Sequence, residues 1–415
     1  MAVPLLNARL DAQAVAAAAN AAGAPAAIVC NAHITGLAVA RSLAAQGVPV
    51  IGLDRDPAGV GLASNALVAA AVCHDPISAE ADFIADLQAI GDHLAQPALL
   101  FGCMDEWVLA ISAHRAELDG RFIAPFADDR IVRRILDKSE LYRAAREAGI
   151  PIPRTADTRL VADAAAMAEV GLPCVLKPAA KRPFYDAVGA NLFVVHTPAE
   201  FAARREQGAA FGMLAQELIP ATADDYVTVG LTAAPNGHVL GSYVGQRLEI
   251  APAGFGTTCL ARGVDLPELE AQAVAIVQQL GYWGIAEVEF LRDPRDGGFK
   301  LLDLNTRPWK WIGLPIAAGV DLPGLLYAAA LGRPIPTPER RLDLLWTSLK
   351  DYVPLRARGE AMQPGDPIGR ERWLQLIAGA PDATVVDAIL DRDDPEPSYR
   401  ALQGIFGLHQ YSCPC

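Results

Sequence analysis

Short apolar runs alternate with segments of helical periodicity in the first third of the chain. Ala26–Cys30 and Val48–Leu53 are apolar enough for buried strands, and Gly36–Gln46 between them has the spacing of a helix. Apolar runs near Leu67–Val72 and Ala98–Gly102 continue the alternation. Strands separated by helices form mainly parallel sheets, so the pattern predicts an α/β domain that ends near residue 126.

Helix-stop signals and an isolated strand follow this region. Asp137 or Ser139 can cap a helix that Gly149 ends. Cys174–Pro178 predicts a strand, and a loop is expected from there to Gly189. The regular alternation of strand and helix therefore stops near residue 127.

The second half carries signals of antiparallel strands. Thr228–Leu231 and Val239–Arg247 flank the dipeptide Asn236-Gly237, which is a strong signal for a β-hairpin. A helix is expected over Pro267–Gln279, and the residues after about Arg333 mix helical and loop patterns without recognisable chemistry. We therefore expect an α+β arrangement here, in contrast to the first third.

Acidic residues gather on one face of a second predicted hairpin. Side chains alternate along a strand, so Glu287 and Glu289 share one face, as do Asp303 and Asn305. A five-residue turn over Pro294–Gly298 would place Glu289 opposite Asp303 and Glu287 opposite Asn305. Three carboxylates this close repel one another unless a cation lies among them, and Mg²⁺ prefers such oxygen ligands. The alternative is a hairpin whose charged face simply contacts water.

Basic and polar residues elsewhere suit a nucleotide. Arg307 shares the face of Asp303 if the strand continues, and its planar fork could contact phosphate. Lys177 ends an apolar strand and could reach phosphate, although a lysine that snorkels from a strand end is common. Glu217, together with backbone groups nearby, could contact an adenine amino group and Asp225 a ribose, but a turn between strands needs neither.

The N-terminal β-α-β pattern raises the possibility of a dinucleotide site. Its turn, Asn31–Gly36, lacks the early glycines that let backbone approach a pyrophosphate, which argues against NAD binding. Asp105 and Glu106 follow the Ala98–Gly102 strand, at the sheet edge where α/β proteins bind ligands. An acid pair that only caps a helix fits the same positions.

Charge and cysteine content narrow the partners. The 415 residues include 35 basic and 48 acidic ones, and the net charge of −13 disfavours nucleic acid and anionic membranes as partners. Seven scattered cysteines without metal-ligand spacing predict reduced thiols in the cytoplasm, and the Cys413/Cys415 tail is given no role. Ala12–Ala27 is interrupted by polar and helix-breaking residues and lacks a basic start, so we expect an N-terminal helix rather than a signal peptide or a membrane span.

Five motifs in order resemble the ATP-grasp superfamily, in which two α+β subdomains close on ATP behind an α/β domain. The motifs are Asp137-Lys138 before a helix that ends at Ala148-Gly149-Ile150-Pro151, Val175-Leu176-Lys177-Pro178, Gln216-Glu217-Leu218-Ile219-Pro220, Glu289, and Asp303-Leu304-Asn305-Thr306-Arg307. The resemblance covers about residues 25–335. It implies a Rossmann-like pre-grasp domain over 1–126, a lid subdomain over 127–215, a subdomain with the metal site over 216–335 and a C-terminal extension over 336–415.

The resemblance also implies site roles. Lys138 and Lys177 would contact the phosphates of ATP, and Gln216, Glu217 and Leu218 would contact its adenine. The Mg²⁺ ions would be bound by Glu289, Asp303 and Asn305. Arg307 would contact the reacting acyl phosphate, and Arg247 would be a further basic residue at the site. The loop after Lys177 departs from the family pattern because it has no glycine run, so Lys181 or Arg182 could replace the backbone phosphate contacts.

Within the superfamily, the chain is most similar to D-aspartate-ligase-like carboxylate–amine ligases, through Pro252–Thr258, Ala286–Phe290 and Arg307–Trp311. This similarity implies an ATP-dependent ligase that forms an amide from small carboxylate and amine substrates through an acyl phosphate, and it makes a homodimer plausible. The candidates for contacting amino-acid-like substrates are Asp105, Glu106, Arg262 and Lys310. A nucleotide-binding protein without ligase chemistry, or an NAD-linked oxidoreductase, are the alternatives.

Overall fold

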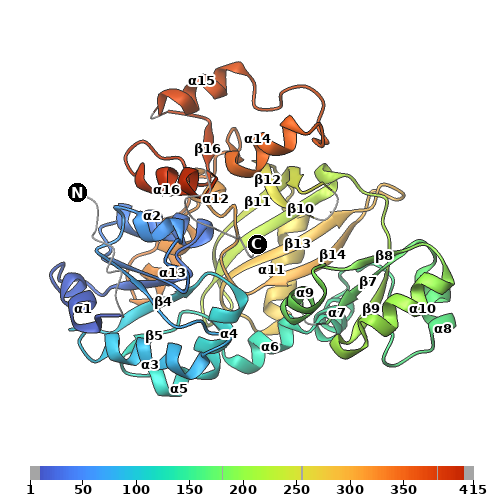
Figure 1. Ribbon diagram of the computed structural model, residues 1–415, viewed down its shortest axis with the longest axis horizontal. Coiled ribbons are helices and arrows are strands. Elements are labelled where there is room, and N and C mark those ends of the chain that lie inside the picture. Colours follow the sequence, from blue (N-terminus) through green and yellow to red (C-terminus); the bar gives the residue numbers. More distant parts are fainter. Residues whose placement is uncertain (1–9, 180, 254–255, 381, 406–415) are drawn as a thin grey trace.

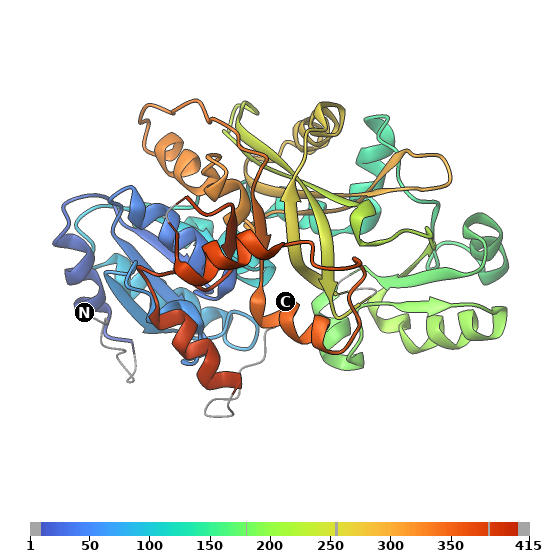
Figure 2. The same ribbon diagram turned by 90° about the horizontal axis from the view of Figure 1, so that it is seen from above.

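Three β-sheets follow one another across the molecule. The computed structural model describes residues 10–179, 181–253, 256–380 and 382–405. In both views the five-stranded sheet lies at one end, the seven-stranded sheet in the middle and the four-stranded sheet at the other end (Figures 1 and 2). Cys413, Cys415 and Phe255 lie outside the described residues, as do the side chains of Lys181 and Arg182.

The five-stranded sheet is parallel, as the alternation of strands and helices predicts, in the order β3-β2-β1-β4-β5. Its strands are β1 (Ala27–Cys30), β2 (Val50–Asp54), β3 (Ala69–Val72), β4 (Ala98–Gly102) and β5 (Phe122–Ile123). Its helices are α1 (Ala12–Asn20), α2 (Ile34–Ala45), η1 (Val60–Ala63), α3 (Glu80–Gly91), α4 (Asp105–Ala113) and α5 (Arg115–Leu118). One apolar core includes α1, α3 and α4, and a second includes α2, so both faces of the strands are buried.

Two short helices lie along the chain between the five-stranded and the four-stranded sheet. They are α6 (Asp129–Leu136) and α7 (Lys138–Glu147). The side chain of Asp137 accepts hydrogen bonds from the backbone N–H groups of Ser139 and Glu140 and thereby caps α7, which settles the choice between the two candidate caps. Gly149 has a positive φ of 70°, a conformation that glycine adopts without strain, and the helix ends just before it.

The four-stranded sheet is antiparallel, in the order β6-β9-β7-β8. It consists of β6 (Thr155–Asp157), β7 (Cys174–Pro178), β8 (Phe193–Val195) and β9 (Met213–Glu217), with α8 (Asp163–Val170), α9 (Lys181–Val188), α10 (Pro198–Gln207) and η2 (Ala209–Phe211). The expected loop between Lys177 and Gly189 is wrong, because most of it is α9. Phe184 anchors this helix: its ring is fully buried, with its centroid 5.3 Å from that of Phe193.

The seven-stranded sheet has the order β14-β13-β10-β11-β12-β15-β16. Its strands are β10 (Tyr226–Ala233), β11 (Val239–Ala251), β12 (Thr257–Gly263), β13 (Gly284–Arg292), β14 (Phe299–Asn305), β15 (Leu345–Thr347) and β16 (Val385–Asp387). The helices are η3 (Ala223–Asp225), α11 (Pro267–Leu280), α12 (Gly313–Ala317), α13 (Leu322–Ala330), α14 (Leu349–Ala357), α15 (Arg370–Ala378) and α16 (Glu396–Ile405). Both predicted hairpins are confirmed.

The C-terminal residues differ from the sequence expectation of helix and loop alone. β15 pairs with β12 and β16 pairs with β15, so this segment extends the large sheet. Strands of three residues are too short to show a period of two, and their pairing depends on partners far away in the sequence. Among the described residues, no helix has the length and apolar character needed to cross a membrane.

Candidate active site

The acidic hairpin has the predicted register. Glu287 pairs with Asn305 and Glu289 pairs with Asp303 across β13 and β14. The predicted five-residue turn is wrong in detail: six residues connect the strand ends, and the register shifts by one residue between Glu289 and Phe290. The bulge compensates for the longer connection, so the four polar side chains still share one face.

Basic side chains lie directly on these carboxylates. Lys138 Nζ donates a hydrogen bond to Asp303 Oδ1, and Arg247 Nη2 lies 2.6 Å from Glu289 Oε2. Asn305 Nδ2 donates to Glu287 Oε2 at 2.9 Å and to Glu289 Oε1 at 3.0 Å. Lys138 and Arg247 therefore come from α7 and β11 to meet on the face of the hairpin.

Glu287 is the most deeply buried acid of the group. Glu287 is 4% exposed, and burial and the charge of Glu289 raise its pKa well above the usual range of a carboxyl, against the opposing charges of Arg247 and Arg307. A protonated Glu287 would relieve the repulsion between the carboxylates when no further cation is present. Glu287 therefore belongs to the site in addition to the residues that the motif pattern names.

The acids and Asn305 fit Mg²⁺ by their chemistry. Glu289, Asp303 and Asn305 offer carboxylate and amide oxygens, which Mg²⁺ prefers, and few protein ligands suffice when phosphates supply the others. Within the described ranges, no group of three or more His, Cys, Asp or Glu side chains is arranged to hold a metal ion. Because Lys138 and Arg247 already contact Asp303 and Glu289, a metal would require these two cations to shift toward another anion.

Lys177 lies beside this group, against Tyr142. Its Nζ donates a hydrogen bond to Tyr142 Oη and lies 5.0 Å from the centroid of the Tyr142 ring. Gln216 Nε2 donates to the same hydroxyl at 3.1 Å, and that hydroxyl donates to the Leu302 carbonyl at 2.9 Å. Burial and the positive charge of Lys138 lower the pKa of Lys177 to about 7.

Tyr142 is a site residue that the motif pattern misses. It lies on α7 four residues after Lys138, so the two side chains share one face of the helix. That spacing is the signal in the sequence that would have found it. Tyr142 joins Lys177 and Gln216, from two strands of the four-stranded sheet, to the backbone of β14.

The side chain of Glu217 belongs to an ion-pair cluster rather than to an open position. Its carboxylate lies 3.0 Å from Arg154, 2.9 Å from Arg295 and 3.1 Å from Lys300. Burial raises the pKa of Glu217, but these hydrogen bonds outweigh it and lower the pKa to about 2. The cluster also includes Asp293 and connects the end of β9 to the acidic hairpin.

The other two nucleotide candidates lie beyond β9. Leu218 follows the end of the strand directly and is half-buried. The carboxylate of Asp225 accepts hydrogen bonds from the backbone N–H and the hydroxyl of Thr222 and lies 3.4 Å from Arg292. Asp225 thus forms a capping box with Thr222 at the start of η3.

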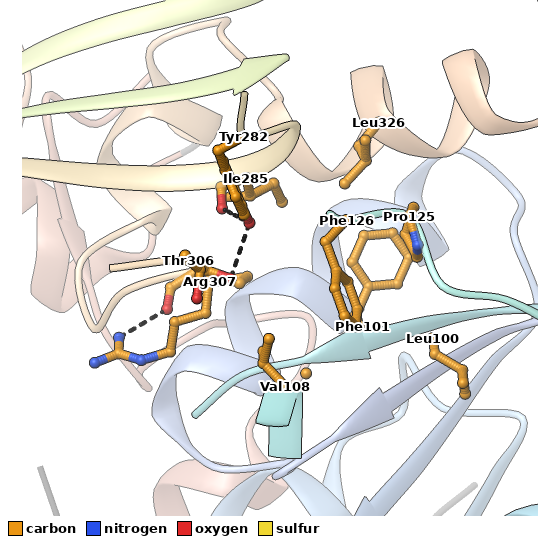
Figure 3. A pocket seen from close by; sticks show the side chains of 12 residues that line it. Leu100, Phe101, Val108, Pro125, Phe126, Tyr282, Ile285, Thr306, Arg307 and Leu326 are labelled. Carbon is orange, nitrogen blue, oxygen red and sulfur yellow. Dashed lines mark hydrogen bonds between the residues drawn. The ribbon is translucent and has the colours of Figure 1, made fainter. Parts of the chain in front are cut away.

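Arg307 extends from the end of β14 toward the five-stranded sheet. Its Nε donates to Asp105 Oδ1 at 2.7 Å, and its Nη2 lies 3.5 Å from Asn305 Oδ1. Burial lowers the pKa of Arg307, but the charges of Asp105 and Glu287 outweigh it, so the pKa is raised and the side chain stays charged. Figure 3 shows the guanidinium turned away from an apolar pocket lined by residues such as Phe101 and Phe126.

Two tryptophans fix the segment that follows Arg307. The ring of Trp309 occupies the space above Gly230, and the ring of Trp311 that above Gly245. A Cβ at either position would overlap the ring, so each tryptophan requires the glycine beneath it. Lys310 lies between the tryptophans and donates to Thr257 Oγ1 at 2.8 Å and to Asp351 Oδ2 at 2.7 Å.

The structure does not bring all substrate candidates together. Arg262 is exposed and donates to Gln246, with which it pairs on the face of the sheet opposite Arg247. Glu106 pairs with Arg55 at 3.1 Å. Of the four candidates, Asp105 contacts the arginine at the hairpin, and Lys310 lies three residues after that arginine along the chain.

Two curated proteins are similar in sequence to part of the chain. No family model matches the chain. D-aspartate ligase of Enterococcus faecium (strain Aus0004) is 26% identical over 233 residues, which are 50% of this chain and 53% of that protein. The arginine-specific large chain of carbamoyl phosphate synthase from Geobacillus stearothermophilus is 28% identical over 249 residues, 56% of this chain and 21% of that protein. The chain thus spans about half the length of the first relative and about a fifth of the second.

Solved structures share the fold over most of the chain. The ADP complex of an N5-carboxyaminoimidazole ribonucleotide synthetase has a TM-score of 0.62 at 16% identity and covers 81% of this chain and 85% of its own. Biotin carboxylase from Campylobacter jejuni, in a β,γ-ATP complex, has a TM-score of 0.60 at 18% identity and covers 79% of this chain and 75% of its own. The chain is therefore similar in sequence to D-aspartate ligase over about half of its length and shares its fold with these two enzymes, in agreement with the resemblance to the ATP-grasp superfamily that the motifs indicate.

Proposed function

We propose that the chain is an ATP-dependent carboxylate–amine ligase that forms an amide or peptide bond and releases ADP and phosphate. The observation that carries the proposal is the convergence of Lys138, Lys177, Arg247 and Arg307 on the face that bears Glu289, Asp303 and Asn305. Four cations around carboxylates suit a site for a polyphosphate and its metal. The similarity to D-aspartate ligase supports amino-acid-like substrates.

ATP would bind between the four-stranded sheet and the hairpin. Lys138 and Lys177, which contact Asp303 and Tyr142, would turn to the phosphates. Backbone groups at Gln216–Leu218 would meet the adenine, since the Glu217 side chain is engaged elsewhere, and Asp225 would meet the ribose. Glu289, Asp303 and Asn305 would hold Mg²⁺, which supplies charge neutralisation at the phosphates when bound.

The reaction would proceed in two transfers. A carboxylate oxygen of the first substrate attacks the γ-phosphorus, the bond to the β–γ bridging oxygen breaks, and ADP leaves. The nitrogen of the amine substrate, after losing a proton, attacks the acyl carbon of the resulting acyl phosphate, and inorganic phosphate leaves. Arg307 would hold the reacting carboxylate and stabilise the charge that develops on its oxygens.

The acyl phosphate must be kept from water, because hydrolysis would waste it. The segment Lys177–Gly189 is the proposed lid, and in the structure most of it is the helix α9, anchored by Phe184. Closure of the four-stranded sheet with this helix over the hairpin would exclude solvent. The Glu217 cluster joins the two parts at one end and suits a hinge.

We further propose a cytoplasmic enzyme that acts on small molecules and forms a homodimer. The five cysteines among the described residues are free and buried, as expected for a reducing compartment. A related fold, the biotin carboxylase domain of a 2-oxoglutarate carboxylase, was solved as a dimer.

Positional isotope exchange tests the acyl-phosphate step. ATP labelled with ¹⁸O in the β–γ bridge is incubated with enzyme, Mg²⁺ and one carboxylate at a time, namely the D and L forms of aspartate, glutamate and alanine. We expect the label to scramble into the non-bridging β positions with a carboxylate substrate alone, because reversible transfer frees the β-phosphate to rotate. Scrambling that requires the amine as well would contradict an acyl phosphate formed before the amine reacts.

A further inference from the structure

A cluster of charged side chains joins the substrate candidate Lys310 to two residues that the sequence motifs do not name, Lys350 and Asp351. It forms where the segment after Arg307 meets the N-terminus of α14. Lys310 Nζ lies 2.7 Å from Asp351 Oδ2, and Lys350 Nζ lies 3.2 Å from Asp351 Oδ1. Thr257 accepts a hydrogen bond from Lys310, and Ser348 donates one to Asp351 at 2.7 Å. The segment after Arg307 and the start of α14 thus place two ammonium groups and the Ser348 hydroxyl around one carboxylate, and Thr257 of β12 binds one of the ammonium groups.

The cluster lies beside the crevice where an open parallel sheet binds ligands. In the order β3-β2-β1-β4-β5, the chain continues from β1 to one side and reaches β4 on the other, so the crevice opens at the carboxyl ends of β1 and β4. His33 follows β1 and is buried, and burial and the charges of Lys350 and Lys310 lower its pKa to about 3, which places both lysines near it. Asp105 follows β4 and binds Arg307.

The spacing along the chain links this cluster to the reacting group. Lys310 lies three residues after Arg307, and three residues span at most about 11 Å. The rings of the tryptophans on either side of Lys310 pack on Gly230 and Gly245, and this packing fixes the backbone of the segment that joins Arg307 to Lys310. The cluster therefore lies next to Arg307 along the chain.

The charges suit a zwitterion better than a purely structural ion pair. Two lysines share one carboxylate in the described part of the chain, which leaves one positive charge in excess at a half-buried position. Lys350 and Asp351 are 24% and 21% exposed at their side chains, so a ligand can reach both. A structural tie between α14 and the large sheet would need only one lysine.

We propose that Lys310, Lys350 and Asp351, with Thr257, form a subsite for the α-carboxylate and α-ammonium of an amino-acid substrate. The lysines and the hydroxyl bind the carboxylate, and Asp351 binds the ammonium. The C-terminal segment thereby takes part in substrate choice through the first residues of α14. The inference rests on the proposed function for its role in catalysis, but it concerns binding and can be measured without turnover.

Calorimetric binding of amino acids tests the subsite. The protein, saturated with MgADP, is titrated with the D and L forms of aspartate, glutamate and alanine, and with the α-methyl ester of each. We expect at least one free amino acid to bind, and its ester to bind at least 10-fold more weakly. Lys350→Ala should weaken the free amino acid by about 10- to 100-fold, the range for a charged hydrogen bond, and leave the ester unchanged. Lys350→Arg should restore most of the affinity.

Arg358→Ala is the matched control, because Arg358 ends the same helix and pairs only with Glu360 among the described residues. Equal affinity of wild type and Lys350→Ala, or no binding of any amino acid, would overturn the subsite. Amino-acid binding that depends on Lys350 without any ADP formation from ATP would instead overturn the proposed ligase and leave the subsite standing. ADP formation by a protein whose amino-acid affinity does not depend on Lys350 would overturn the subsite and leave the proposed ligase standing.

Discussion

Replacement of Asp303 by alanine is expected to lower kcat for ADP release by about 100-fold or more while the protein stays folded. Asp303 faces the site from β14, and its carboxylate contacts Lys138. With ATP bound, the same carboxylate would be free to hold Mg²⁺ as Lys138 turns to the phosphates. The alanine variant would lose this ligand and the charge that positions Lys138, and both losses act on the transferred phosphoryl group.

Two companion variants make the Asp303 result specific. Asp303→Glu keeps a carboxylate and should retain activity within about 10-fold, because Mg²⁺ tolerates either acid. Asp296→Ala removes an acid from the exposed turn of the same hairpin, where its carboxylate accepts a hydrogen bond from the backbone N–H of Gly298, and it should leave kcat unchanged. Near-normal activity of Asp303→Ala would remove this residue from the metal site.

Lys177→Met is expected to lower kcat by a similar factor and to abolish a proton uptake that accompanies ATP binding. Burial and the charge of Lys138 lower the pKa of Lys177 to about 7 in the free protein, so at pH 8 its amine is mostly neutral. The phosphates of ATP would raise this pKa, because they favour the charged form. Binding at pH 8 should therefore take up close to one proton, and ATP affinity should fall as the pH rises above 7.

Calorimetry at pH 8 in two buffers of different ionisation enthalpy measures this uptake. At pH 6 Lys177 is already protonated in the free protein, so the wild type should take up few protons there, which serves as an internal control. The methionine variant should show no uptake at either pH. Uptake at pH 8 that persists in Lys177→Met would assign the proton to another group and separate Lys177 from the phosphates.

The sequence predicts the site well where the alternation or length of a strand agrees with the pattern of apolar, acidic and turn residues. Cys174–Pro178 is an apolar run bounded by turn residues, and the strand has these bounds. The pairing of Glu287 with Asn305 follows from strand alternation and the acidic pattern, yet the bulge and the six-residue connection that produce it have no signature in composition. The register was therefore predictable, whereas the path of the backbone was not.

The sequence fails where position depends on distant partners. Arg262 is close to the site in sequence order, but the pairing of β12 with β11 turns it to the opposite face. Lys350 and Asp351 begin a helix that is unremarkable in sequence and reaches the site only because β15 pairs with β12. Glu217 belongs to one of the sequence motifs, but its ion pairs with Arg295 and Lys300 depend on the contact between two sheets, which the motif does not predict.

The most direct measurement is ADP release from MgATP with amino acids offered singly and in pairs, with the products followed by mass. We expect ADP to accumulate only with a particular carboxylate–amine pair, together with a product lighter than the two partners by one water. ADP that accumulates equally without any acceptor, or tight ATP binding with no condensed product from any pair, would contradict a carboxylate–amine ligase.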